Sequence, residues 1–135
     1  MPVDCFFDSS VLIYILTRDD PRWFQATRLL NLGGFISVQV LNEFTSVARR
    51  KLRLDWDVLE LALKEVREFC EEPLAVTVAS HEAGLEIAQR YKYHIYDSLI
   101  IAAALDAGCT TLYSEDMQDG QRIGALTIRN PFRVN

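Results

Sequence analysis

Short apolar runs alternate with longer amphipathic segments along the whole chain. Runs of about five apolar residues are typical of strands buried on both faces of a parallel sheet, whereas apolar residues spaced three and four apart are typical of helices. The pattern predicts five strands, at residues 3–7, 35–38, 74–78, 109–113 and 125–129. It predicts helices between them, at residues 11–18, 21–32, 39–52, 54–72, 80–91 and 96–107.

This alternation predicts an α/β fold, with a parallel sheet covered by helices on both faces. No repeat or linker divides the sequence, so residues 1–135 are expected to form a single domain. No stretch approaches the roughly 20 apolar residues of a membrane span, and the start lacks the basic region of a secretory signal. Cys5, Cys70 and Cys109 lie far apart in apolar segments, as buried thiols do in a reducing compartment. We therefore expect a cytoplasmic protein without a membrane partner.

Four acidic residues stand where the predicted elements join or at the edge of an apolar helix face: Asp8, Glu43, Asp97 and Asp116. Ligands of parallel α/β sheets bind beyond the carboxyl ends of the strands. Asp8 directly follows the first predicted strand and Asp116 follows the fourth, so the two are neighbours if these strands are adjacent. Carboxylates that meet in one place repel one another unless a cation joins them. The leading hypothesis is therefore a divalent-metal site.

Each acid also has a plainer interpretation. Asp8 can cap the helix that follows, although Ser9 and Ser10 can do so equally well. Glu43 lies three residues after Val40 on a helix whose apolar stripe it borders, where a surface glutamate is equally compatible with the pattern.

The two remaining acids also have plainer interpretations. Asp97 precedes the apolar run SLIIAAAL, whose N-cap is expected to be Asp97 or Ser98. Asp116 lies in the polar turn YSEDMQDG, where Ser114 can hold a neighbouring carboxylate. The joint placement of the four acids, and no single one of them, carries the hypothesis.

Other chemistries lack their residues. His81 and His94 have no zinc-ligand spacing, and the sequence contains no G-x-S-x-G elbow, P-loop or G-x-G-x-x-G loop. An aspartyl-phosphate phosphatase would need a second acid two residues after Asp8, where Ser10 stands. The formal charge of −5 argues against a nucleic-acid partner at first sight. Without the four acids, however, 15 acidic residues face 14 basic ones, so a bound cation would form a positive spot on a nearly neutral surface.

The segments FFDSSVLIY, VLNEF, IYDSLIIAAAL and LYSEDMQDG, in this order, resemble the PIN-domain family, and most of all its small VapC-type toxins. The resemblance covers essentially the whole chain. It implies a three-layer α/β/α sandwich around a five-stranded parallel sheet. It also implies a Mg²⁺- or Mn²⁺-dependent endoribonuclease that cleaves RNA by metal-activated water, the toxin of a type II toxin-antitoxin pair. Such a toxin is expected to form a homodimer and to bind a cognate antitoxin.

By position, the family's catalytic and metal-binding acids fall on Asp8, Glu43, Asp97 and Asp116. Ser114 matches the residue that supports the last acid, and Asp119 is a further candidate near the metal. Ser10 stands where many relatives carry Asn, which puts a hydrogen bond from that position in question. Two alternatives remain open: a non-enzymatic module whose acidic groove binds a basic peptide, and a DNA-directed flap-type nuclease.

If RNA is the substrate, basic side chains hold its phosphates and aromatic or guanidinium planes stack on its bases. The candidate phosphate contacts are Arg18, Arg22, Arg49, Arg50 and Lys92. Trp23, Phe24 and Phe35 are expected in the core, but two of them exposed together would mark a partner surface.

Overall fold

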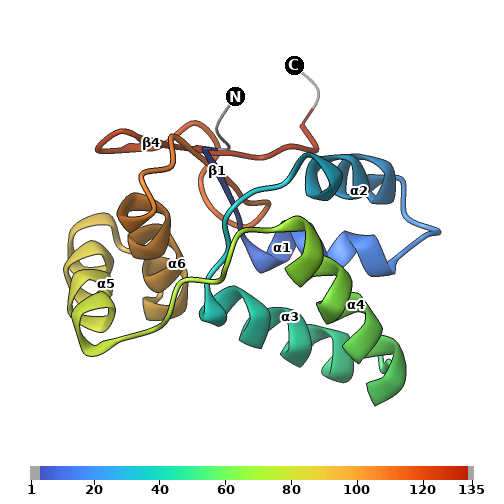
Figure 1. The fold of residues 1–135 in the computed structure, drawn as a ribbon. Helices are drawn as coiled ribbons and strands as arrows, with labels where there is room; N and C mark the ends of the chain where they lie inside the picture. Colours follow the sequence, from blue (N-terminus) through green and yellow to red (C-terminus); the bar gives the residue numbers. More distant parts are fainter. Residues whose placement is uncertain (1–3, 134–135) are drawn as a thin grey trace.

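The computed structural model describes residues 4–133 and has an α/β fold (Figure 1). Its four strands form one sheet in the order β1–β2–β4–β3. The strands are β1 (Cys5–Phe7), β2 (Thr111–Tyr113), β3 (Arg122–Ile123) and β4 (Leu126–Arg129). β1 pairs with β2 and β2 with β4 in parallel, whereas β3 runs antiparallel to β4. The adjacency of β1 and β2 brings the segments that follow them to the same edge of the sheet.

The prediction of a five-stranded parallel sheet is wrong. The predicted strands at 35–38 and 74–78 are extended segments that make only isolated parallel bridges, from Phe35 to Phe6 and from Leu74 to Ser37. Helices begin at Val38 and Val78, so each segment ends before a ladder of hydrogen bonds is complete. Conversely, the short β3 was not predicted. It forms a hairpin with β4, with Gly124 in the turn at a φ of +59°, a conformation that favours glycine. Val3, the predicted start of the first strand, lies outside the described residues.

Every predicted helix is present within residues 4–133, although the first is short. The helices are α1 (Ser9–Leu12), which continues as the 3₁₀ helix η1 (Ile13–Leu16), α2 (Arg22–Leu32), α3 (Val38–Arg50), α4 (Trp56–Phe69), α5 (Val78–Tyr91) and α6 (Ile95–Asp106). Figure 1 shows α5 and α6 packed as a pair on one side of the strands, with α1 to α4 on the other. No helix of the described chain is both long and apolar enough to cross a bilayer.

The core lies between the central strands and the helices. Phe6 of β1, Leu112 of β2 and Ile128 of β4 are fully buried, and so are Ile100 and Ile101 of α6. Burial of each such side chain contributes about 1.5–3 kcal/mol. The apolar run of α6 therefore packs along its length, as its composition predicts, and fixes the end of the helix that carries Asp97.

Candidate functional site

Asp8 lies immediately after β1 and is 2% exposed. It occupies the N-cap position of α1, but its side chain makes no capping hydrogen bond. Its Oδ2 instead accepts hydrogen bonds from the hydroxyls of Ser10 and Ser114, each at 2.8 Å. Its Oδ1 has no hydrogen-bond partner among residues 4–133. The carboxylate is thus held by one oxygen and left unpaired at the other.

The surroundings of Asp8 penalise its charged form. Burial raises the pKa of Asp8 to about 7, and the hydrogen bonds from Ser114 and Ser10 act in the opposite direction. The nearby carboxylates of Glu43 and Asp97 also raise it, and the pKa of about 7 is the net result of these effects. The charged form of Asp8 is thus disfavoured by two acidic neighbours and by an oxygen without a partner. A bound cation would offset the repulsion and would pair with that oxygen.

Glu43 lies on α3 at the border of the buried stripe formed by Val40, Phe44 and Ala48. The side chain is half-buried, as the spacing predicts. Its Oε1 accepts a hydrogen bond from Ser9 Oγ at 3.0 Å, and its Oε2 accepts one from Gln39 Nε2 at 2.9 Å. The two contacts fix the carboxylate from α1 on one side and from the preceding turn of α3 on the other.

Asp97 lies in the first turn of α6 and is half-buried. The N-cap of this helix is His94, whose Nδ1 accepts a hydrogen bond from the backbone N–H of Tyr96 at 3.2 Å. The prediction that Asp97 or Ser98 caps the helix is therefore wrong, and the Asp97 carboxylate is free for another role. Burial raises the pKa of Asp97, as do Glu43 and Asp116, and His94 lowers it.

Asp116 follows β2 in an exposed turn. It lines a hollow of about 330 Å³ together with Ser9, Ser10 and Glu43, so the turn, α1 and α3 all contribute to its walls. Asp119 is engaged elsewhere, because its Oδ1 accepts a hydrogen bond from the backbone N–H of Asn130 at 2.7 Å and its Oδ2 pairs with Arg133 at 3.4 Å. Those contacts fasten the C-terminal segment.

The structure thus brings the four predicted acids into one electrostatic neighbourhood. Asp8 interacts with Glu43 and Asp97, and Asp97 interacts with Glu43 and Asp116. The acids nevertheless stay apart: in the described part of the chain, no three His, Cys, Asp or Glu side chains are close enough to form a ready-made metal site. The donor set still suits a hard cation, since it consists of carboxylate oxygens and includes the unpaired Asp8 Oδ1. The metal-binding role of these residues stays a prediction.

A network that the sequence did not indicate holds the turn before Asp116. Glu115 accepts a hydrogen bond from the Tyr14 hydroxyl and pairs with Arg22 at 2.9 Å. Arg22 also pairs with Asp20 at 2.8 Å and lies 4.3 Å over the Tyr14 ring. In addition, the backbone N–H of Glu115 donates to Ser10 Oγ at 3.0 Å. Only the acidic cluster in the turn signalled such contacts, and its partners are distant in sequence.

Several predicted phosphate contacts are occupied within the protein. Arg22 belongs to the network above, and Arg49 donates to the carbonyl oxygen of Leu54 at 2.7 Å while lying over the ring of Trp56. Arg18 lies over the Trp23 ring at 5.3 Å. Of the aromatic residues considered for a partner surface, only Phe24 is exposed, while Trp23 and Phe35 are partly buried.

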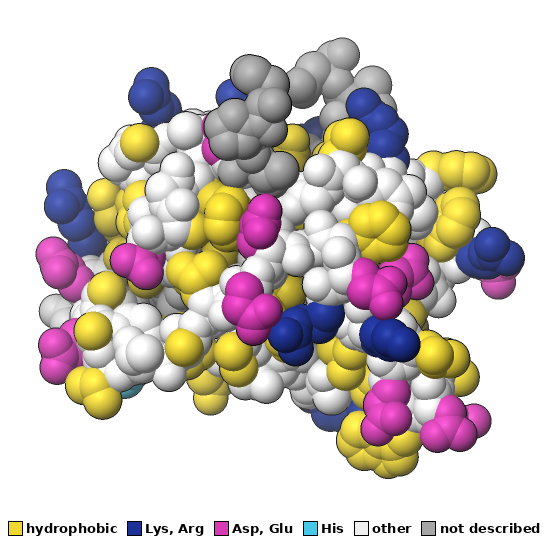
Figure 2. Space-filling model, in the orientation of Figure 1, with side chains coloured by type: hydrophobic (Ala, Val, Ile, Leu, Met, Phe, Trp, Pro, Cys, Tyr) yellow, Lys and Arg dark blue, Asp and Glu magenta, His cyan; other side chains and the backbone are white. Residues whose placement is uncertain are grey.

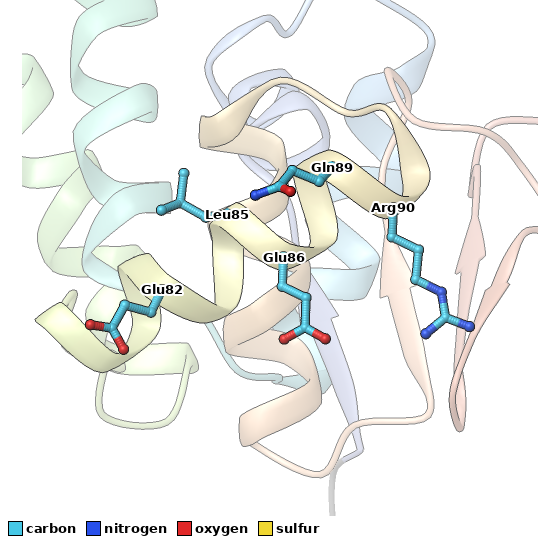
Figure 3. Close-up of a pocket in the computed structure, with 5 residues that line it drawn as sticks. All are labelled: Glu82, Leu85, Glu86, Gln89 and Arg90. Carbon is cyan, nitrogen blue, oxygen red and sulfur yellow. The ribbon is translucent and has the colours of Figure 1, made fainter.

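Another hollow, of about 520 Å³, lies elsewhere (Figure 3). It is lined by Glu82, Leu85, Glu86, Gln89 and Arg90, all on α5. A single helix cannot enclose a ligand, and in Figure 3 these side chains spread outward from the helix. None of the four acids lines it. We therefore place the candidate site at the acids and not in the hollow on α5.

The sequence pattern of the family described as PIN domain matches residues 5–121. This chain belongs to the PIN domain family. PIN domains generally depend on a divalent metal, in keeping with the acids that the fold collects here. A comparison with curated proteins gives no match.

Solved structures share the fold of this PIN domain. VapC20 from Mycobacterium tuberculosis, a sarcin-ricin loop cleaving toxin, is 22% identical, with a TM-score of 0.68 over 83% of this chain and 89% of that one. A toxin-antitoxin complex from Klebsiella pneumoniae has a TM-score of 0.70 at 18% identity, covering 96% and 99% of the two chains. VapBC2 from Rickettsia felis, bound to a DNA fragment from its promoter, has a TM-score of 0.67 at 17% identity, covering 93% and 97%.

Proposed function

We propose that this PIN domain is a metal-dependent endoribonuclease and the toxin of a type II toxin-antitoxin pair, acting in the cytoplasm. The observation that carries the proposal is the buried Asp8 carboxylate, whose Oδ1 is unpaired and whose neighbours are Glu43 and Asp97. Family membership supports a nuclease, and the structural neighbours, which include toxins and toxin-antitoxin complexes, support the toxin assignment.

Mg²⁺ or Mn²⁺ would be held by Asp8 and Asp97, with Glu43 and Asp116 completing the site directly or through water. Both ions prefer oxygen ligands, and Mg²⁺ in particular keeps several waters when only a few carboxylates bind it. When bound, such a cation stabilises negative charge on the phosphodiester and supplies a nucleophile from water near neutral pH.

The chain's own residues keep the carboxylates in place. Ser10 and Ser114 orient Asp8 through its Oδ2, which leaves Oδ1 for the ligand. Ser9 orients Glu43, so α1 supports two of the four acids at once. Hydrogen bonds of this kind to a metal-binding carboxylate are typically worth 10- to 100-fold in metal affinity or activity.

The surface charge of the molecule favours an RNA substrate only at the proposed metal site. Figure 2 shows acidic and basic side chains interspersed over the face drawn there, without one continuous basic surface. Affinity for phosphate would therefore come from the bound cation and a few nearby basic side chains. The description of VapC20 as a sarcin-ricin loop cleaving toxin supports RNA over DNA as the substrate class.

Exposed apolar side chains on α2 and α4 support a protein partner. They include Phe24 at 74%, Leu32 at 66%, Trp56 at 57% and Leu61 at 70% exposure. The two helices pack against each other, and Figure 2 shows hydrophobic side chains at the end of α4. A large contiguous patch of exposed apolar groups typically marks a protein contact. We propose that an antitoxin or the second protomer of a homodimer covers them.

The proposed activity is tested with Asp8→Asn and Asp97→Asn. Each substitution removes a charge needed to hold the cation, so Mg²⁺-dependent cleavage of structured RNA is expected to fall at least about 100-fold. Asp106→Asn, at the exposed far end of α6, is the matched control and should cleave normally. Undiminished cleavage by both site variants would refute the proposal.

The same assay separates the two alternatives. Efficient cleavage of branched DNA without cleavage of RNA would favour the flap-type nuclease. Calorimetric titration with Mn²⁺ addresses the basic-peptide module, because a peptide-binding groove should take up no metal at millimolar concentration.

A further inference from the structure

Two hollows meet along α3, and the proposed metal site accounts for only one of them. The first, of about 330 Å³, is the one lined by Asp116 and Ser10, and Lys51 also lines it. The second, of about 370 Å³, lies between α3 and the start of α6. Both are lined by Glu43 and Val47, so α3 forms the ridge between them.

The second hollow has a composition unlike that of the first. Apart from the shared Glu43 and Val47, its polar residues Gln39, Asn42 and Ser46 are uncharged, and Tyr96 and Arg50 complete its lining. Within residues 4–133, the side chains of Asn42, Ser46 and Arg50 make no hydrogen bond or ion pair. Glu43 is the one carboxylate in this lining, so the hollow offers a metal ion no second acid. The uncharged donors and acceptors beside one cation suit a neutral polar ring joined to a phosphate.

Tyr96 presents an aromatic ring beside the proposed site. The residue is 55% exposed, directly precedes Asp97 and lies in the first turn of α6. Its backbone is fixed by the hydrogen bond to His94, and the two rings lie 5.1 Å apart. An exposed ring held in a rigid helical turn is a ready stacking surface for a nucleobase.

The basic residues at the end of α3 lie one in each hollow. Arg50 lines the second hollow and Lys51 the first. Arg50 lies seven positions after Glu43 on the helix, a rise of about 10 Å along the axis. A strand cleaved near Glu43 would therefore have cations to contact its phosphates in either hollow, away from the bond that is cut.

We propose that the second hollow is a base-binding subsite for single-stranded RNA. This inference rests on the proposed ribonuclease function and names a further part of the same site. One unpaired base next to the cleaved bond stacks on Tyr96, Asn42 and Ser46 hydrogen-bond its edge, and Arg50 contacts a neighbouring phosphate. The subsite selects unpaired nucleotides, because a base within a duplex cannot reach the ring.

The test measures binding in the cleavage-deficient Asp8→Asn background, by fluorescence anisotropy with a short labelled single-stranded RNA. A companion set of RNAs carries one abasic nucleotide at successive positions. Adding Tyr96→Ala is expected to weaken Kd about tenfold, within the roughly 5- to 150-fold range for stacking of one base. Tyr96→Phe keeps the ring and is expected to bind normally.

The abasic RNAs make the test specific to stacking. One abasic position should weaken binding by a similar factor when Tyr96 is present and should cause no additional loss in the Tyr96→Ala protein. Arg50→Ala should reduce the dependence of log Kd on log salt by about one phosphate contact. Lys64→Ala, on the exposed face of α4, is its control and should leave that dependence unchanged.

The outcomes separate this inference from the function beneath it. If the wild type cleaves RNA but Tyr96→Ala binds every RNA as its parent does, the subsite is refuted and the nuclease stands. If abasic positions weaken both proteins equally, the base is bound elsewhere and the subsite is likewise refuted. A wild type that neither binds nor cleaves RNA would overturn the proposed function, and this inference with it.

Discussion

Asp8 combines two features that rarely occur together in a carboxylate. One oxygen receives two hydroxyl hydrogen bonds at 2.8 Å, and the other is buried with no partner in the described chain. Buried polar atoms normally find a partner, so an unpaired carboxylate oxygen calls for an explanation in terms of function. A site kept ready for a cation provides one.

Stability without metal should depend on the protonation of Asp8. Its pKa is about 7 in the folded protein against an ordinary 3.8, so the folded chain binds this proton more tightly than the unfolded chain does. The burial penalty is absent below pH 3.8 and complete above about pH 7, and the free energy of unfolding should fall by about 4 kcal/mol across that window. The raised pKa of Asp97 acts in the same direction.

Urea unfolding in the presence of a chelator measures this dependence between about pH 5 and about pH 8. Asp8→Asn serves as the control, because it cannot titrate and should show a much shallower loss over the same range. Equal slopes for the two proteins would show that the titration of Asp8 does not govern stability.

The sequence predicted the positions of the acids better than it predicted the residues that hydrogen-bond or pair with them. The i, i+3 and i+4 spacing predicted the half-buried position of Glu43, and this is confirmed. The contacts of Ser9 with Glu43 and of Arg22 with Glu115 were not predicted. They join residues 34 and 93 positions apart, and no local pattern records such pairings.

At the level of elements, the helices were predictable and the sheet was only partly so. Helical periodicity and capping are local properties, whereas a strand exists only if a neighbour supplies a complete ladder. The segments at 35–38 and 74–78 are extended beside β1, as their apolar runs suggest, yet they reach only isolated bridges. β3 was missed because it has two residues and depends on the adjacent β4.

The close approach of the extended segment to β1 explains why residue 34 is a glycine. A Cβ at Gly34 would lie 2.6 Å from Phe7 Cε2 and 3.0 Å from Cys5 Sγ, which is too close for either contact. Phe7 is fully buried, so it has little room to move. Gly34→Ala is therefore expected to lower the free energy of unfolding by about 1–3 kcal/mol, as measured by urea denaturation.

A second background distinguishes crowding from other effects of that substitution. In Phe7→Leu the ring is gone, so introducing Gly34→Ala there should cost clearly less than it does in the wild type. The same cost in both backgrounds would mean that the Phe7 ring is not the obstacle.

On the scale of the whole molecule, repulsion among the four acids lowers the stability of the folded protein, and a bound cation would reduce that repulsion. A ligand that binds only the folded state stabilises it by an amount set by its concentration relative to Kd, about 2.7 kcal/mol at a hundredfold excess. Mg²⁺ or Mn²⁺ should therefore raise the Tm of the wild type near pH 8 and leave that of Asp8→Asn almost unchanged.

Thermal unfolding in chelator and in added metal gives this comparison directly. Sodium chloride at matched ionic strength controls for general screening of charge. The same Tm in both salts would mean that Mg²⁺ or Mn²⁺ does not bind specifically to the acids.

The ion pair between Arg22 and Glu115 has a consequence for the outermost acid. Arg22 is 42% exposed in its side chain and Glu115 24%, so dissolved ions can weaken their attraction, whereas they reach the buried Asp8 hardly at all. The proposed site thus has an inner part around Asp8, which is buried in the protein interior. Its outer part around Asp116 is held to α2 by the partly exposed ion pair of Arg22 with Glu115. Added salt should weaken the attachment of the turn next to Asp116 and leave Asp8 unaffected, so Asp116 is the proposed ligand whose position depends on ionic strength.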